Sequence, residues 1–236
     1  MLLDTAATGF PPLDLTKIVL AIGALGTAAY GLVDVSKGFG GGISNRGFGD
    51  IKKVVSPFIP ASAPQTSVSA LSLDSVLATL RSNWLNGMAL SDQKSVAKAL
   101  IKLNLNADTA ARMAAATGVD DKVLASIARK LSTGQAFTPE ETDSYGRFDL
   151  LLSAVLDQGY QRADQRYRNS SKLLAVPVAV GLAVLGAWAI SPGPLQPLDT
   201  WRAIVGGILA TPLAPVAKDV ASAIQQGSKL AQAWKK

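Results

Sequence analysis

The feature that most constrains the fold is an uncharged, mostly apolar run of eighteen residues, Leu173 to Ile190. As a helix rising about 1.5 Å per residue, this run would be about 27 Å long, close to the ~30 Å hydrocarbon core of a bilayer. Pro192-Gly193-Pro194 follows and cannot continue a helix easily. The run therefore predicts a membrane-spanning helix.

A polar helix leads into this apolar run. Thr138-Pro139-Glu140-Glu141 offers a hydroxyl cap, a proline suited to the first turn and acids near the positive helix end. Apolar residues then recur at helical spacing: Phe148, Leu151, Leu152, Val155 and Leu156, continued by Tyr160 and Tyr167. Two alternatives stay open at the junction, one continuous helix or a new helix capped by Asn169-Ser170-Ser171. Because Pro177 removes a backbone donor, we expect a bend there.

Two further apolar stretches complete the predicted spans. The first, Ile18 to Val33, is short for a crossing, so Leu15 and Val35 are expected to extend it. The last, Ala203 to Ala217, contains Pro212 and Pro215 and is expected to be broken or kinked. Small residues recur four apart in each span and predict close helix packing: Gly23, Thr27 and Gly31; Ala179, Ala183 and Ala187; Gly206, Ala210 and Ala214.

The chain contains neither cysteine nor histidine. This excludes a Ser-His-Asp triad, a Cys-His dyad, zinc sites of the usual type and conventional haem ligation. Asp108, Asp120 and Asp121 invite interpretation as a metal cluster, but the EF-hand pattern is missing and acids in a first helical turn need no metal. We therefore predict no enzyme activity, no cofactor and no metal.

Positive charge is concentrated beside the apolar runs. Residues 36–56, 161–172 and 218–236 each carry four basic residues against one acid, whereas residues 71–160 carry nine against ten. Basic segments beside spans stay cytoplasmic, and three crossings put all three clusters on one side. This predicts the N-terminus outside, residues 36–172 inside, 191–201 outside and the C-terminus inside, in a plasma or inner membrane. Anionic headgroups are the expected partners, and a nucleic acid is not.

The glycine-rich stretch Lys37 to Asp50 is the most unusual part of the sequence. It matches neither phosphate-binding template, G-x-G-x-x-G or G-x-x-x-x-G-K-[ST]. The favoured interpretation is a flexible juxtamembrane hinge with Arg46, Lys52 and Lys53 facing anionic lipid. The alternative is a re-entrant loop in which three apolar side chains enter the interface or line an oligomer axis: Phe39, Ile43 and Phe48. The candidate functional residues of this loop are Gly40, Gly41, Gly42, Arg46 and Phe48.

Three charges are candidates at the inner face: Asp34, Lys218 and Asp219. A carboxylate in a span can mark an ion path, but Asp34 lies near the end of its span, where headgroup water accounts for it better. Two alternatives stay open for Lys218 and Asp219: they lie among the headgroups, or one of them pairs with Asp34 or Arg46 at the inner face.

Four short helices are expected between residues 71 and 134. Their starts are expected at Ser72 or Ser69, at Ser91-Asp92, at Asn106 or Asp108, and at Asp120-Asp121, and two of them end at Gly118 and Gly134.

The predicted fold class is therefore an all-α integral membrane protein with three transmembrane helices and a cytoplasmic helical bundle. Its parts are an external tail with the first transmembrane helix (1–35), a glycine-rich then proline-rich juxtamembrane linker (36–70), a helical bundle with a long exit helix (71–171), a transmembrane hairpin (172–217) and a basic amphipathic tail (218–236). The function that fits is a non-enzymatic, oligomeric membrane-anchored assembly or scaffold subunit whose bundle binds a cytoplasmic protein. An oligomeric channel or pore-forming effector is the alternative.

Overall fold

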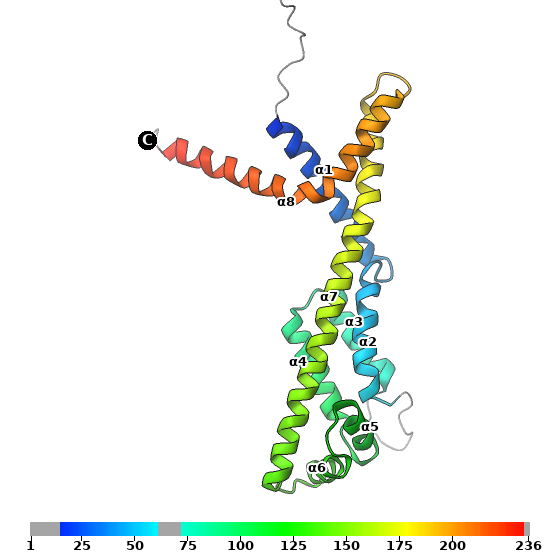
Figure 1. Ribbon diagram of the computed structural model, residues 1–236, viewed down its shortest axis with the longest axis vertical. Coiled ribbons are helices and arrows are strands. Elements are labelled where there is room, and N and C mark those ends of the chain that lie inside the picture. The colour runs from blue at the N-terminus through cyan, green and yellow to red at the C-terminus, as the bar shows by residue number, and fades with distance from the viewer. Residues whose placement is uncertain (1–14, 61–71, 234–236) are drawn as a thin grey trace, which may run out of the picture. The chain divides into compact units, whose positions relative to one another are not determined.

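The computed structural model describes residues 15–60 and 72–233 (Figure 1). Every regular element in these residues is a helix. The chain divides into two compact units: Lys37–Ser170, named here the helical unit, and Met1–Ser36 with Ser171–Lys236, named the apolar unit. The prediction of an all-helical chain is confirmed for the described residues.

The helical unit contains six helices in full and the first part of a seventh. Its elements are α2 (Ser44–Val55), η2 (Ser56–Phe58), α3 (Leu73–Leu85), α4 (Leu90–Leu103), α5 (Ala107–Thr117), α6 (Asp121–Thr133) and the start of α7 (Pro139–Ile190). A short 3-10 helix, η1 (Ser36–Gly38), precedes α2.

Side-chain caps set most of these helix starts, as the sequence predicts. The Ser72 hydroxyl accepts from the amide of Ser75 at the start of α3, and Asn106 and Thr109 form a reciprocal capping box on α5. The Asp120 carboxylate accepts from the amides of Lys122 and Val123, so capping α6 accounts for this acid. Helix α4 differs from the prediction: it begins at Leu90, without a side-chain cap.

One hydrophobic core joins all the helices of the helical unit. Its largest fully buried side chains are Phe58, Ile51, Ile59, Leu80, Ile101, Met113, Leu124, Ile127, Phe148, Leu152, Leu156 and Tyr160. These residues come from both ends of the unit's sequence, which explains how its first and last helices are held together.

Residues 36–60 do not form the predicted linker. They contain α2, and Ile51, Val55 and Phe58 are buried in the core. The apolar residues recur at helical spacing and outweigh the flexibility expected from the glycines. The proline-rich part of the predicted linker, residues 61–70, lies outside the described residues.

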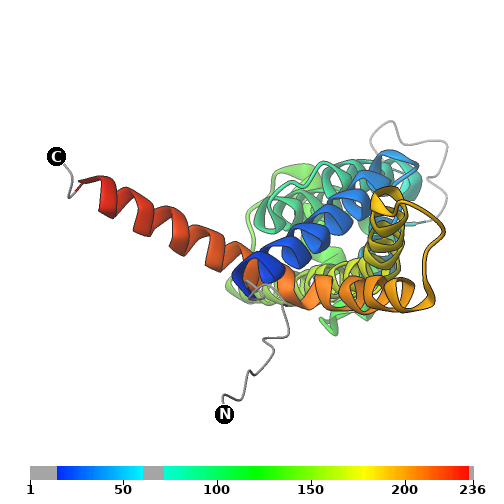
Figure 2. The same cartoon turned by 90° about the horizontal axis from the view of Figure 1, so that it is seen from above.

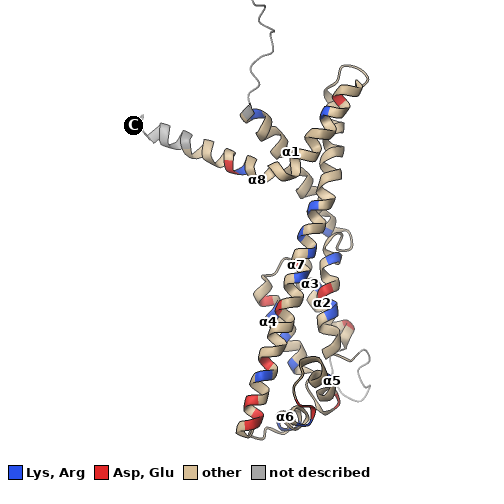
Figure 3. Cartoon of the chain, viewed as in Figure 1, with Lys and Arg blue, Asp and Glu red and all other residues tan. Residues whose placement is uncertain are grey.

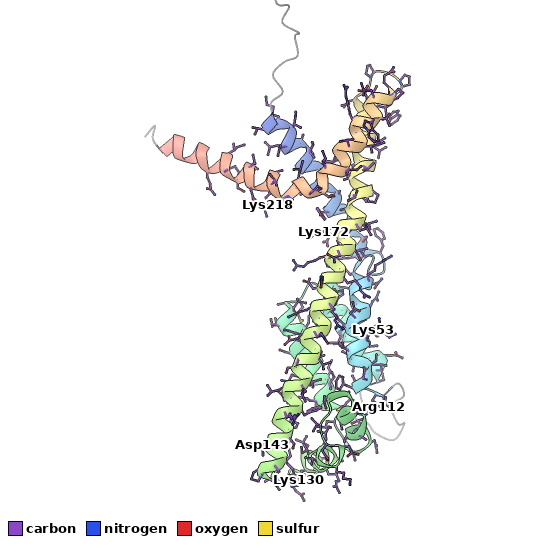
Figure 4. The ribbon with its side chains drawn as sticks, in the orientation of Figure 1. Lys53, Arg112, Lys130, Asp143, Lys172 and Lys218 are labelled. Atoms are coloured by element: carbon purple, nitrogen blue, oxygen red, sulfur yellow. The ribbon has the colours of Figure 1, made fainter. Side chains whose placement is uncertain are left out.

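The start of α7 is fixed by a network around Glu141. Its carboxylate accepts from the Thr138 amide at 2.8 Å, from Lys130 Nζ at 2.6 Å and from the Ser126 hydroxyl at 2.8 Å. The Thr138 hydroxyl accepts from the Glu141 amide in return, which completes the capping box. Figure 4 labels Lys130 near the start of α7. These hydrogen bonds, led by that from Lys130, lower the pKa of Glu141 from 4.5 to about 2.

Ion pairs also join α4 to α7. Lys98 and Lys102 donate to the two oxygens of Asp149, at 2.5 and 3.0 Å, and Lys94 pairs with Asp157. Burial alone would raise the pKa of Asp149, but the two lysine hydrogen bonds outweigh it and lower the pKa. The lysine stripe of α4 is therefore matched by acids on α7.

The apolar unit contains α1 (Leu15–Val35), the last part of α7 and α8 (Pro197–Ala233). Each of these three helices is long and apolar enough to cross a membrane. Figure 3 shows the scarcity of charged residues along them. Many of their large apolar side chains are exposed in the chain alone, among them Leu173, Leu185, Trp188, Ile190 and Trp201, as expected for faces that contact lipid.

Helix α1 packs closely on α8 (Figures 1 and 2). Gly23 lies against Ala217, and Gly26 lies against Ala210 and Ala214. Thr27 and Gly31 are exposed and lie off this contact, so their role in helix packing stays a prediction. The buried positions of α1 are Gly23, Gly26, Ala29 and Val33, a spacing of three and four that follows the 3.6-residue turn better than fours alone.

Of the small residues predicted to pack in α7 and α8, some are buried in the apolar unit and others are not. Ala179, Ala210 and Ala214 are buried. Ala183 and Ala187 instead line a hollow of about 540 Å³ near the turn between the two helices. The close approach of α8 to α7 is at Gly207 rather than Gly206: a Cβ on Gly207 would lie 2.5 Å from Val180 Cα.

Prolines do not end either long helix. Helix α7 runs from Pro139 to Ile190 through Pro177, so of the two alternatives at the junction the structure has the continuous helix. Helix α8 contains Pro212 and Pro215, and Figure 1 shows that its axis changes direction along its length. The third span is therefore kinked and not broken, since a proline removes one backbone hydrogen bond and displaces the preceding turn.

Acid is expected to destabilise the helical unit through Glu141. Because its pKa is lower in the folded chain than its ordinary 4.5, its contribution is complete above pH 4.5 and is lost as the pH falls to about 2. Thermal unfolding of the full chain in detergent, followed by circular dichroism from pH 6 to 2, measures this. Glu141→Gln should lower the melting temperature at pH 6 and flatten this pH dependence. The exposed neighbour provides the control, Glu140→Gln, and equal effects of the two variants would contradict the assignment.

The two α1 glycines should respond differently to a large side chain. Gly26→Leu should destabilise the apolar unit by roughly 1–3 kcal/mol, because its side chain would enter space held by the α8 backbone at Ala210. Gly31→Leu should not destabilise the unit, since a Cβ there meets nothing within 4 Å and leucine favours a helix over glycine. Denaturant unfolding in detergent compares the two, and an equal loss would place the α1 contact elsewhere.

Candidate functional site

The glycine-rich segment forms a fixed turn between η1 and α2. Gly40, Gly41 and Gly42 have φ of +66°, +95° and +43°, in the left-handed region that side-chain-bearing residues avoid. The Gly41 amide donates to the carbonyl of Lys37, and the Ser44 amide donates to the carbonyl of Gly41. Glycine is therefore required here for the backbone path.

Helix α3 holds this turn through side chains. Arg81 Nη2 donates to the carbonyl of Gly40 at 2.6 Å and to Asn45 Oδ1 at 3.0 Å. Trp84 Nε1 donates to the carbonyl of Ser44 at 3.0 Å. These bonds correct the favoured prediction of a flexible hinge, because backbone carbonyls of the turn accept hydrogen bonds from side chains of α3.

Aromatic contacts extend the same assembly to α7. The ring of Tyr167 packs edge-on against Trp84, with 6.2 Å between centroids, and the ammonium of Lys37 lies 4.9 Å from the centre of the Tyr167 ring. The turn, α3 and α7 therefore meet at Tyr167, with a cation over an aromatic face.

The loop residues predicted as functional are not brought together on one surface. Phe48 packs against the core of the helical unit, whereas Arg46 is exposed on α2. Of the three apolar residues in the re-entrant interpretation, Phe39 is 82% exposed and Ile43 is half-buried. The packing of Phe48 against the core argues against that interpretation.

The inner-face candidates all belong to the apolar unit. Asp34 is exposed on α1, and Lys218 and Asp219 are exposed near the middle of α8. Figure 4 labels Lys218. Their suggested ion pairing stays a prediction.

Helices α2 and α7 approach closely through two glycines. A Cβ on Gly47 would lie 2.6 Å from the Ala163 carbonyl oxygen and 2.7 Å from Trp84 Cζ2. Gly159 on α7 lies against the side chain of Val54. The small residues bring the two helix backbones together.

A polar pocket lies beside this contact. It has a volume of about 280 Å³ and is lined by Asp50 of α2 and by Arg162, Gln165, Arg166, Asn169 and Ser170 of α7. The five α7 residues recur at helical intervals of three, four, seven and eight, so they share one helix face. This pocket is the candidate functional site.

An ion pair between a buried carboxylate and an exposed arginine forms one side of the pocket. Asp50 is only 7% exposed, and its Oδ2 lies 3.1 Å from Arg166 Nε. The same oxygen makes no hydrogen bond of good geometry within the described part of the chain. The pair brings the guanidinium of Arg166 on α7 next to the carboxylate of Asp50 on α2.

Chemically, the pocket is a set of hydrogen-bond donors with an excess of positive charge. Sequence reasoning found the basic segment 161–172 but missed the pocket. The spacing of Arg162, Arg166 and Asn169 was a usable signal, whereas nothing local in the sequence identified Asp50 as their neighbour.

The comparisons with known proteins add no relative. No protein-family model, curated protein or solved structure matches this chain.

Two glycines of α2 should respond in opposite directions to alanine. Gly47→Ala should destabilise the helical unit by roughly 1–3 kcal/mol, because the new methyl group would overlap Ala163 and Trp84. Gly49→Ala should stabilise it by about 0.5–1 kcal/mol, since its Cβ meets nothing and alanine favours a helix. Urea unfolding, followed by tryptophan fluorescence and circular dichroism, distinguishes the two. Destabilisation by both substitutions would contradict the close α2–α7 contact.

Proposed function

We propose that this chain is a non-enzymatic, membrane-anchored assembly or scaffold subunit that forms homo-oligomers and presents its helical unit on the cytoplasmic side. The observation that carries the proposal is connectivity: a unit with its own core is joined in sequence, at both ends, to helices of membrane length. Two anchors suit a protein that holds a binding surface at a membrane. The three basic clusters support the orientation, since all lie on one side of a three-span topology.

Small residues on the surface of the apolar helices support self-association. A Cβ on Gly31, Gly181, Gly186 or Gly206 would meet nothing within 4 Å. Glycines that serve no close contact within the chain leave room for the backbone of a second copy.

The helical unit also offers exposed apolar side chains for a protein partner. Leu103 on α4 is 71% exposed and Leu150 on α7 is 72% exposed, on two helices joined by the lysine–aspartate pairs. Exposed leucines beside ion pairs are suited to a binding surface with an apolar centre and a polar rim.

Cysteine cross-linking tests the oligomer sharply, because the chain has no cysteine of its own. Single variants Gly31→Cys, Gly181→Cys and Gly206→Cys, oxidised in lipid vesicles at low protein density, are expected to give a covalent dimer from at least one position. Gly193→Cys, in the turn between α7 and α8, is the control. Monomeric mass in lipid nanodiscs, together with no cross-link at any of the three positions, would overturn the oligomer.

The channel is the second candidate, and the two prolines of α8 favour it. Pro212 and Pro215 have no amide hydrogen, so the carbonyls of Ile208 and Thr211 lack their usual helical donors. Carbonyls freed inside a membrane require a polar neighbour or water, and they can line an ion path.

Ion flux separates the two proposals. If the chain is a scaffold, an ion indicator trapped inside vesicles that contain the cross-linked oligomer should show no change in fluorescence when ions are added outside. Flux that Pro212→Ala with Pro215→Ala abolishes would favour the channel and overturn the scaffold.

A further inference from the structure

The α2–α7 pocket is built for a small, charged group. All six residues that line it are polar or charged, and its volume of about 280 Å³ is slightly below that of pockets that enclose whole small molecules, about 300–1,000 Å³. Those larger pockets are mostly apolar. The ligand that fits here is therefore a polar headgroup or a small ion.

The charges of the pocket favour an anion. Asp50 occupies the Nε edge of Arg166, which leaves that guanidinium its terminal NH₂ groups. Arg162 has no carboxylate within 4.0 Å in the described ranges and is exposed. Two guanidinium groups against one carboxylate leave the pocket with one net positive charge.

The neutral groups complete the recognition chemistry. Gln165, Asn169 and Ser170 add two side-chain amides and a hydroxyl, all able to donate to oxygen. A terminal phosphoryl group presents three strong acceptor oxygens, whereas a carboxylate presents two, and guanidinium groups bind phosphate in a bidentate manner. We propose that this pocket binds a terminal phosphoryl group, with Arg162 and Arg166 as its charged donors and Asp50 positioning Arg166.

A lipid headgroup is the source that the sequence favours. Ser170 precedes Leu173, the first residue of the apolar run, by three residues on the same continuous helix, about 4.5 Å of helical rise. Headgroup phosphates lie at the boundary of such a run. Inorganic phosphate shares this chemistry and is the other source. The proposal does not depend on the oligomer or on a protein partner.

The test uses the full chain in nanodiscs of three compositions: phosphatidylcholine alone, and phosphatidylcholine with an equal fraction of either phosphatidic acid or phosphatidylglycerol. Phosphatidic acid ends in a phosphoryl group, whereas the phosphate of phosphatidylglycerol lies between two glycerol groups. Native mass spectrometry counts the lipids retained by each variant. Inorganic phosphate is added to the phosphatidylcholine discs in a separate measurement.

The variants separate the pocket from its charged surroundings. Arg162→Gln should weaken retention of phosphatidic acid about tenfold, as expected for the loss of hydrogen bonds from a charged group. Asn169→Leu should weaken retention without changing the charge. Arg168→Gln is the matched control, because Arg168 belongs to the same basic segment but pairs with Asp164 and does not line the pocket. Circular dichroism checks that each variant is folded.

Selective retention of phosphatidic acid that Arg162→Gln and Asn169→Leu reduce and Arg168→Gln preserves would support the proposal. Binding of inorganic phosphate to the phosphatidylcholine discs, reduced by the same two variants and unaccompanied by selective lipid retention, would support the phosphoryl site but assign it to the free anion. Equal retention of the two anionic lipids, or equal effects of Arg162→Gln and Arg168→Gln, would overturn the proposal.

Discussion

Close approach between helix backbones, allowed by glycine, is the constraint on which both units depend. In the helical unit, Gly47 lies against the Ala163 carbonyl, and in the apolar unit Gly23 and Gly26 lie against α8. A methyl group at these positions would overlap atoms that have little freedom to move. Contacts of this kind provide packing energy only when both surfaces fit, because dispersion attraction falls steeply with a gap of an ångström. The positions of Asp50, Tyr167 and the pocket follow from this α2–α7 contact.

The sequence predicted the features that depend on neighbouring residues. Caps such as Asn106 and Thr138 act within three or four residues, so a short stretch of sequence contains both the donor and the acceptor of their hydrogen bonds. Uninterrupted apolar length likewise identified the three candidate spans. Contacts between segments far apart in the chain could not be predicted from a short stretch of sequence. The α2 segment was interpreted as a linker because its glycines suggest flexibility, whereas the core that orders Ile51 and Val55 comes from helices much later in the chain.

At the candidate site, too, the local feature could be predicted from the sequence and the long-range contact could not. The basic segment on α7 was recognised from its charge, but the ion pair with Asp50 joins residues more than a hundred positions apart. Elsewhere in the helical unit, Lys98 and Glu141 have partners on neighbouring helices, so their charges stabilise the fold. Within the described residues Arg162 forms no such ion pair, and it lines the α2–α7 pocket instead.

The fixed glycine turn has a consequence for the order of events during synthesis. Gly40 and Ser44 accept hydrogen bonds from Arg81 and Trp84, which lie 41 and 40 residues later in the chain. The turn therefore leaves the ribosome well before the side chains that give it its shape. Glycine loses more conformational freedom on ordering than any other residue, so the turn has little tendency to form alone. The connection after the first apolar helix therefore gains these hydrogen bonds only once α3 has been made.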